Sequence, residues 1–131
     1  MSEKSSQAAV DRVDPERSLQ LARAAAQVAV DHGAENVVIM DLSDHSANFD
    51  YFVIGTGRSQ RQLRALADEI DDKLEKELHD KRIHIDGADT SQWVVLDYGT
   101  VLVHLFDETT RMFYGLEALW ADCPRIPWQT A

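Results

Sequence analysis

The sequence is poor in the features that mark several large classes of protein. Cys123 is its one cysteine, so no disulfide can form within the chain and a reducing compartment is expected. The start of the chain contains no apolar run of the kind that a secretory signal needs. No apolar stretch approaches the roughly 20 residues that a membrane-spanning helix requires. We therefore expect a soluble, cytoplasmic protein without a membrane partner.

Basic residues are also scarce. The 131 residues include 13 Lys and Arg against 23 Asp and Glu, which gives a formal net charge of −10. Because nucleic-acid phosphates attract clustered Lys and Arg, this charge opposes non-specific binding to nucleic acid and favours a basic protein surface as the partner. Acidity that serves only solubility explains the charge equally well. The hydrophobic fraction of 44% is that of an ordinary folded chain, and the length fits one domain.

The limits of this domain follow from the polar ends of the chain. We expect a flexible N-terminal tail at residues 1–13, a single α/β domain at residues 14–123 and a C-terminal tail at residues 124–131. Pro124 and Pro127 are expected to end regular structure.

Capping signals and apolar spacing predict helices that alternate with strands. Asp14-Pro15 is typical of a helix start, and Ser59 with Gln62 matches a capping box before apolar residues at helical spacing. The order predicts an α/β fold with a mixed sheet of about five strands and packed helices, whose parallel part comes from a strand-helix-strand passage around the second helix. Strands are expected at residues 36–42, 51–56, 81–86, 92–98 and 100–106, and a final helix at residues 108–120.

The last two expected strands flank a glycine, which predicts a tight hairpin. A turn at Tyr98-Gly99 pairs Leu96 with Val101 and Trp93 with His104. Alternation then makes one face wholly aliphatic, so that it packs on helices. The other face combines an aromatic anchor with polar groups, as protein-binding surfaces do, although a core tryptophan with a solvated rim fits the same pattern. This second face carries Trp93, Val95, Asp97, Thr100, Leu102 and His104.

A glycine loop offers the first candidate for chemistry. Gly55-Thr56-Gly57 lies between a strand and a helix start, where backbone N–H groups attract phosphates. The third glycine of the dinucleotide fingerprint and the Walker lysine are absent, and a tight turn explains both glycines without a ligand. A small nucleotide-dependent transferase that uses this loop and Asp41 is nevertheless the rival hypothesis.

Other catalytic candidates are weaker still. The acidic residues and histidine of the polar loop lack the spacing of a defined metal site, and neither the serines nor Cys123 has a nucleophile context. We therefore expect no enzyme activity and no cofactor. These candidates are Asp41, which ends a strand, and Asp44, His45 and Asp50 of the loop.

Three arginines crowd the start of the second expected helix, where the helix dipole disfavours cations. They are Arg58, Arg61 and Arg64. Pairing with a nearby carboxylate such as Asp68 accounts for them, and contact with an anion or a nucleic-acid backbone is the alternative.

Four ordered motifs also carry a resemblance. They are DYFVIGTGRS at residues 50–59, WVVLDYG at 93–99, VHLF at 103–106, and Arg111 followed by YGLEALW at 114–120. Together they resemble the ribosomal silencing factor family, also called the Iojap family, from about Ser18 to Pro124. The resemblance implies nucleotidyltransferase-like α-β-α layering without that activity. It also implies binding to the large ribosomal subunit through its protein number fourteen, which sterically blocks joining of the small subunit and represses translation under nutrient limitation or in stationary phase.

The resemblance places the partner-binding residues on two of these motifs. Carried over position by position, they are Asp50, Tyr51, Trp93, Leu96, Asp97 and Tyr98, to which the hairpin face adds His104. The three arginines are expected to make a secondary contact with ribosomal RNA or another anion. Two positions depart from the family: Gly55 replaces the usual alanine, and Thr100 replaces a common aspartate at the hairpin tip. A homodimer is a further option, because exposed aromatic residues also form self-interfaces.

Overall fold

The computed structural model describes residues 15–87 and 92–129. Its elements, in chain order, are α2 (Pro15–Asp31), β1 (Glu35–Asp41), β2 (Tyr51–Thr56), α3 (Gln60–Leu78), β3 (His84–Asp86), β4 (Trp93–Asp97), β5 (Val101–Phe106), α4 (Glu108–Tyr114), α5 (Leu116–Leu119) and β6 (Arg125–Ile126). The predicted α/β fold with a mixed sheet is confirmed.

The sheet has six strands in the order β3-β4-β5-β2-β1-β6, one more than the expected number of about five. The added strand, β6, pairs with β1 and lies beyond the expected domain limit at residue 123. The one parallel pair joins β2 to β5, whereas the other neighbours run antiparallel. The crossover from β2 therefore includes β3 and β4 as well as α3, because β3 lies at the far edge.

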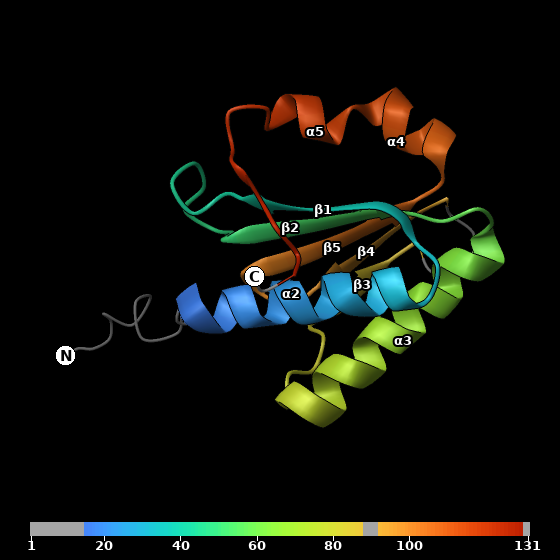
Figure 1. The fold of residues 1–131 in the computed structure, drawn as a ribbon, viewed down its shortest axis with the longest axis horizontal. Coiled ribbons are helices and arrows are strands. Elements are labelled where there is room, and N and C mark those ends of the chain that lie inside the picture. Colours follow the sequence, from blue (N-terminus) through green and yellow to red (C-terminus); the bar gives the residue numbers. More distant parts are fainter. Residues whose placement is uncertain (1–14, 88–91, 130–131) are drawn as a thin grey trace.

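Helices cover the two faces of the sheet unequally. Figure 1 shows α2 and α3 on one side and the short helices α4 and α5 on the other. On the α2 side the core is large, because alanines along α2 let its backbone approach the strands closely. These fully buried alanines are Ala22, Ala25, Ala26 and Ala29. On the α4 side a smaller core packs around Met40, Phe52 and Phe106.

The capping box at the start of α3 is confirmed. Ser59 Oγ accepts a hydrogen bond from Gln62 N at 3.1 Å, while Gln62 Oε1 accepts one from Arg58 N at 2.6 Å. A buried stripe of Leu63, Leu66, Ala67, Ile70 and Leu74 then follows at helical spacing. Local sequence signals are thus sufficient to define this helix.

The expected hairpin register is wrong by two residues. The structure pairs Trp93 with Phe106 and Leu96 with Val103, and Tyr98 N donates to Val101 O at 2.9 Å to close the turn. The cause is Gly99, which has a φ of 94° at the first central position of a two-residue turn. A shift of two residues leaves each strand residue on its expected face.

Three further features differ from expectation. The final helix is split, because Gly115 ends α4 in a left-handed conformation with a φ of 57°. Thr100 lies in the hairpin turn, where its Oγ1 is 2.6 Å from Ser18 Oγ of α2, and not on the α4 side of the sheet. The strand expected at residues 81–86 covers only His84–Asp86.

Candidate functional site

The expected partner-binding residues do not form one surface. Trp93, Asp97 and His104 belong to the α4 side of β4 and β5, whereas most of the others are buried on the α2 side. The buried group consists of Tyr51, Leu96 and Tyr98, together with the carboxylate of Asp50. The two groups therefore have different roles.

Tyr98 is a structural residue. Its side chain is 2% exposed, and its hydroxyl donates a hydrogen bond to the carboxylate of Asp71 on α3. The same carboxylate forms an ion pair with Arg82. Burial raises the pKa of the Tyr98 hydroxyl, so it remains a neutral donor. Tyr98 thus fastens the hairpin to α3 and has no surface to offer to a partner.

Asp50 is likewise a structural residue, because its carboxylate accepts a hydrogen bond inside the protein. Ser18 Oγ donates to Asp50 Oδ2 at 2.9 Å, so Thr100 Oγ1 donates in turn to Ser18 Oγ at 2.6 Å. All three side chains are buried. They join the start of α2, the start of β2 and the hairpin turn, which places the carboxylate of Asp50 out of a partner's reach.

The α4 side of β4 and β5 remains partly open, and we call Trp93, Val95, Asp97 and Leu102 the open sheet face. All four side chains are half-buried. The Trp93 ring lies 4.8 Å from that of Tyr114 and 5.3 Å from that of Phe106, measured between centroids. Trp93 is therefore a rigid, partly accessible aromatic side chain, as a binding anchor should be.

His104 holds the Trp93 side chain in place through a hydrogen bond. Its Nδ1 accepts a hydrogen bond from Trp93 Nε1 at 3.2 Å, so the proton of the neutral ring is on Nε2. That buried Nε2–H has no hydrogen-bond partner within residues 15–87 and 92–129. Burial lowers the pKa of His104 to about 4, which keeps the ring neutral at physiological pH.

A second exposed feature lies on α4 and α5, and the sequence analysis did not identify it. Met112, Phe113 and Leu119 are 74%, 80% and 75% exposed, and we call them the apolar rim. The signal was present in the sequence, since Met112, Phe113 and Tyr114 are consecutive and one helix face cannot bury all three. No residue of α4 is buried.

Arg111 holds α4 against the sheet. Its Nη1 donates to Thr56 Oγ1 at 2.8 Å and to Asn36 O at 2.9 Å, while Nε donates to Glu117 at 2.8 Å. The hydrogen bond from Arg111, helped by its charge, lowers the pKa of Glu117, which keeps this carboxylate ionised. Arg125 of the β6 strand adds a second ion pair to Glu117 at 3.3 Å.

The glycine loop is packed as a structural turn. A Cβ on Gly57 would lie 2.7 Å from Leu63 Cδ2, so close packing explains this glycine. Gly57 N donates to Phe106 O and Arg58 N to Gln62 Oε1, which leaves neither amide for a phosphate. The adjacent cavity of about 340 Å³ is also lined by three carboxylates, from Glu35, Asp107 and Glu108, which would repel an anion.

The acidic loop does not gather into a metal site. Asp41 Oδ1 accepts from Ser43 N at 2.9 Å and from Ser43 Oγ at 2.6 Å, whereas Asp50 is turned into the tie with Ser18. In the described part of the chain, no group of three or more His, Cys, Asp or Glu could hold a metal ion. Its helices are also too short or too polar to cross a membrane.

The three arginines are exposed at the start of α3. Arg58 Nη1 lies 3.6 Å from Glu35 Oε2, so its carboxylate partner comes from β1 and not from Asp68. This exposed pair contributes little to stability.

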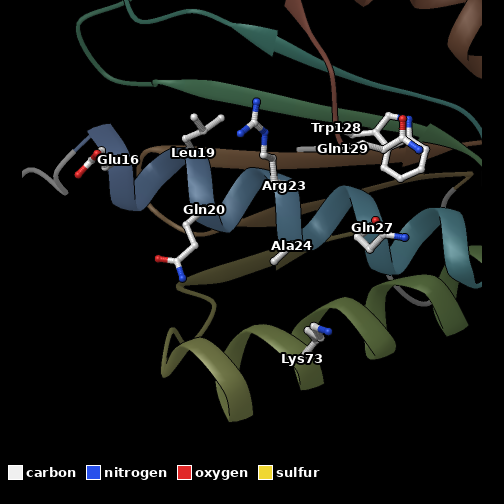
Figure 2. Close-up of a pocket in the computed structure, with 9 residues that line it drawn as sticks. All are labelled: Glu16, Leu19, Gln20, Arg23, Ala24, Gln27, Lys73, Trp128 and Gln129. Carbon is white, nitrogen blue, oxygen red and sulfur yellow. The ribbon is translucent and has the colours of Figure 1, made fainter. Parts of the chain in front are cut away.

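An open groove of about 770 Å³ runs along the outer side of α2 (Figure 2). Trp128 and Gln129 line it together with Lys73 of α3, and Arg23 points away from Lys73. Arg23 Nε donates to Pro127 O at 3.3 Å, which attaches the C-terminal segment to α2. The groove contains no arrangement of a nucleophile with a base.

Comparisons with known proteins identify relatives of this chain. A family model described as "Ribosomal silencing factor during starvation" matches residues 15–131. The chain is 38% identical over 101 residues to ribosomal silencing factor RsfS of Bacillus subtilis, covering 76% of this chain and 84% of that protein. It is 34% identical over 90 residues to a mouse protein named "Mitochondrial assembly of ribosomal large subunit protein 1", covering 66% of this chain and 39% of that protein. A crystal structure from Chromobacterium violaceum superimposes with a TM-score of 0.76 at 28% identity, covering 83% of this chain and 88% of that one.

Proposed function

We propose a mechanism for this chain on the premise that it belongs to the ribosomal silencing factor family, whose members are non-enzymatic regulators of the ribosome. In this mechanism it binds the large ribosomal subunit through ribosomal protein number fourteen and sterically blocks joining of the small subunit. Translation is thereby repressed when nutrients are limiting. This mechanism requires only that the protein binds and occupies space on the large subunit. It requires no chemical reaction.

The observation that carries this proposal is the open sheet face. Trp93 is held between His104 and Tyr114, so little side-chain entropy is lost when a partner covers it. Asp97 lies on the same face, and the whole chain has a net charge of −10. A basic ribosomal protein is therefore a better electrostatic match than the phosphate surface of ribosomal RNA. Arg58, Arg61 and Arg64 make at most a secondary contact with RNA.

The size of the domain supports steric blocking. A folded chain of about 100 residues has a radius of gyration of about 13 Å. Two docked subunits leave room between their contact surfaces for little more than ordered water molecules, so a protein of this size does not fit there. A bound copy would therefore keep the two subunits apart wherever it overlaps their contact surface.

The cytoplasm is the proposed compartment. Support for this comes from bacterial relatives, of which the Bacillus subtilis protein is 38% identical to this chain.

The decisive experiment is co-sedimentation with isolated large subunits. Trp93→Ala is expected to weaken binding about 30-fold, since truncating a central aromatic anchor typically costs about 2 kcal/mol or more. Arg61→Ala, the matched surface control, should weaken it less than about threefold, because exposed ion contacts are weak. Both variants must first give the far-UV circular dichroism of the wild type. A loss for Arg61→Ala that equals or exceeds that for Trp93→Ala would overturn this ranking of the surfaces. Wild-type protein that stays in the supernatant would exclude the proposal.

The rival transferase hypothesis predicts a different response to ligands. With nucleotides and magnesium, we expect no change in Tm, because the amides of the glycine loop are occupied and carboxylates surround it. Differential scanning fluorimetry with ATP and GTP checks this, and a rise in Tm that grows with nucleotide concentration would favour the transferase.

A further inference from the structure

We propose that the apolar rim, Met112, Phe113 and Leu119, anchors the chain to its large-subunit protein partner. The rim would enter an apolar recess of that partner bordered by lysine or arginine side chains. This inference rests on the proposed function, because it concerns the same partner. It adds α4 and α5 to an interface that the sequence motifs place on the strands alone.

The first argument is exposure. Nearly all large aliphatic and aromatic side chains of the described residues are buried or half-buried, whereas the three rim side chains are between 74% and 80% exposed. Met112 and Phe113 are neighbours on α4, and Leu119 lies on the following short helix, α5. An exposed apolar group of this kind is a recurring mark of a protein interaction site.

The second argument is continuity with the open sheet face. The Phe113 ring lies 5.0 Å from the Tyr114 ring, edge to face, and the Tyr114 ring lies 4.8 Å from that of Trp93. An unbroken series of aromatic rings thus leads from β4 to the rim. One partner surface that covers Trp93 would therefore extend onto α4.

The third argument is rigidity. The Arg111 side chain is only 10% exposed, and its hydrogen bonds to Asn36, Thr56 and Glu117 connect α4 to two strands and to α5. Since α4 buries no residue of its own, these bonds and the Tyr114 contact determine where the rim lies. A preorganised surface loses less entropy on binding, which favours affinity.

The fourth argument is charge and defines the partner's chemistry. Exposed Glu108 lies one turn before Met112, and exposed Asp122 follows Leu119 by three residues. Arg111 and Arg125, the nearby cations, are both paired with Glu117. The rim is therefore an apolar centre with acidic borders, which complements an apolar recess with basic borders.

The test compares Phe113→Ser and Met112→Ser with Ile83→Ser in co-sedimentation with large subunits. Ile83 is a matched control, because it is 70% exposed and lies beside Gly99 on the hairpin turn, away from α4. We expect each rim variant to bind at least tenfold more weakly, and Ile83→Ser to bind within twofold of the wild type. Rim variants that bind as well as the wild type would overturn the inference while leaving the proposed function intact. Failure of the wild type to bind would instead overturn both.

Arg111→Lys tests the positioning step. Lysine keeps the charge but cannot form the forked bonds to Glu117 and Thr56, so we expect binding to weaken severalfold. Combined with Phe113→Ser, it should add little further loss, because a displaced α4 and a missing ring remove the same contact. If the double variant lost affinity by the product of the two single losses, Arg111 would not act by positioning the rim.

Light scattering tests whether the apolar rim instead binds a second copy of this chain. If the wild type is a dimer and the rim variants are monomers that bind large subunits as tightly as the wild type, the rim is a self-interface and the inference is wrong.

Discussion

Replacing Tyr98 with alanine is expected to lower the free energy of unfolding by about 3–5 kcal/mol, because it removes a buried aromatic ring and leaves a cavity. The ring packs in the core on the α2 side, and its hydroxyl hydrogen-bonds Asp71, which is also paired with Arg82. Urea unfolding followed by circular dichroism measures this change.

Tyr98→Phe is the matched control for this experiment. It keeps the ring and removes only the hydrogen bond to Asp71, so we expect a loss of about 1–2 kcal/mol. Binding of the folded Phe variant to large subunits should equal that of the wild type. A Tyr98→Ala protein with wild-type stability but weak binding would show that Tyr98 contacts the partner directly, against the structure.

Acidification from pH 6.5 to pH 4 is expected to remove about 3 kcal/mol of stability through His104 alone. Its pKa falls from 6.5 in the unfolded chain to about 4 in the folded protein, because the ring is buried. Between these values the unfolded state takes up a proton that the folded state does not, so stability falls as pH falls. The contribution is fully present above pH 6.5 and lost by about pH 4. Urea midpoints measured across this range check it.

His104→Gln isolates that contribution. Glutamine does not titrate and still offers Trp93 an acceptor, so the variant should lack the fall between pH 6.5 and 4.5. Glu117 does not disturb this comparison. Its pKa is lowered from 4.5, so its contribution to the free energy of unfolding is present above pH 4.5 and is lost only below that pH. A variant whose stability fell as steeply as that of the wild type would assign the pH dependence to other groups.

The parts of the fold that local chemistry determines could be predicted from the sequence. The capping box at Ser59 and the apolar spacing after it define α3 without reference to the rest of the chain. The two faces of the hairpin were also predictable, since alternation along a strand is a local property. The register was not, because it depends on how Gly99 and Thr100 close the turn, and Thr100 is held there by Ser18, 82 residues away.

The candidate site was predicted less well, because burial depends on which helix covers which part of the sheet. Alternation placed Leu96 on the face that packs on helices, but it did not indicate that Tyr98 is covered there too. It also did not indicate how little of the other face α4 and α5 would cover. The break at Gly115, which turns a single expected helix into two short ones, sets the position of the apolar rim.

The pairing of β1 with β6 has a consequence for synthesis. Strand β1 begins at Glu35, whereas its outer neighbour is Arg125–Ile126, near the end of the sequence. During synthesis β1 therefore leaves the exit tunnel long before this neighbour does. Its outer edge stays unpaired until Arg125 and Ile126 emerge.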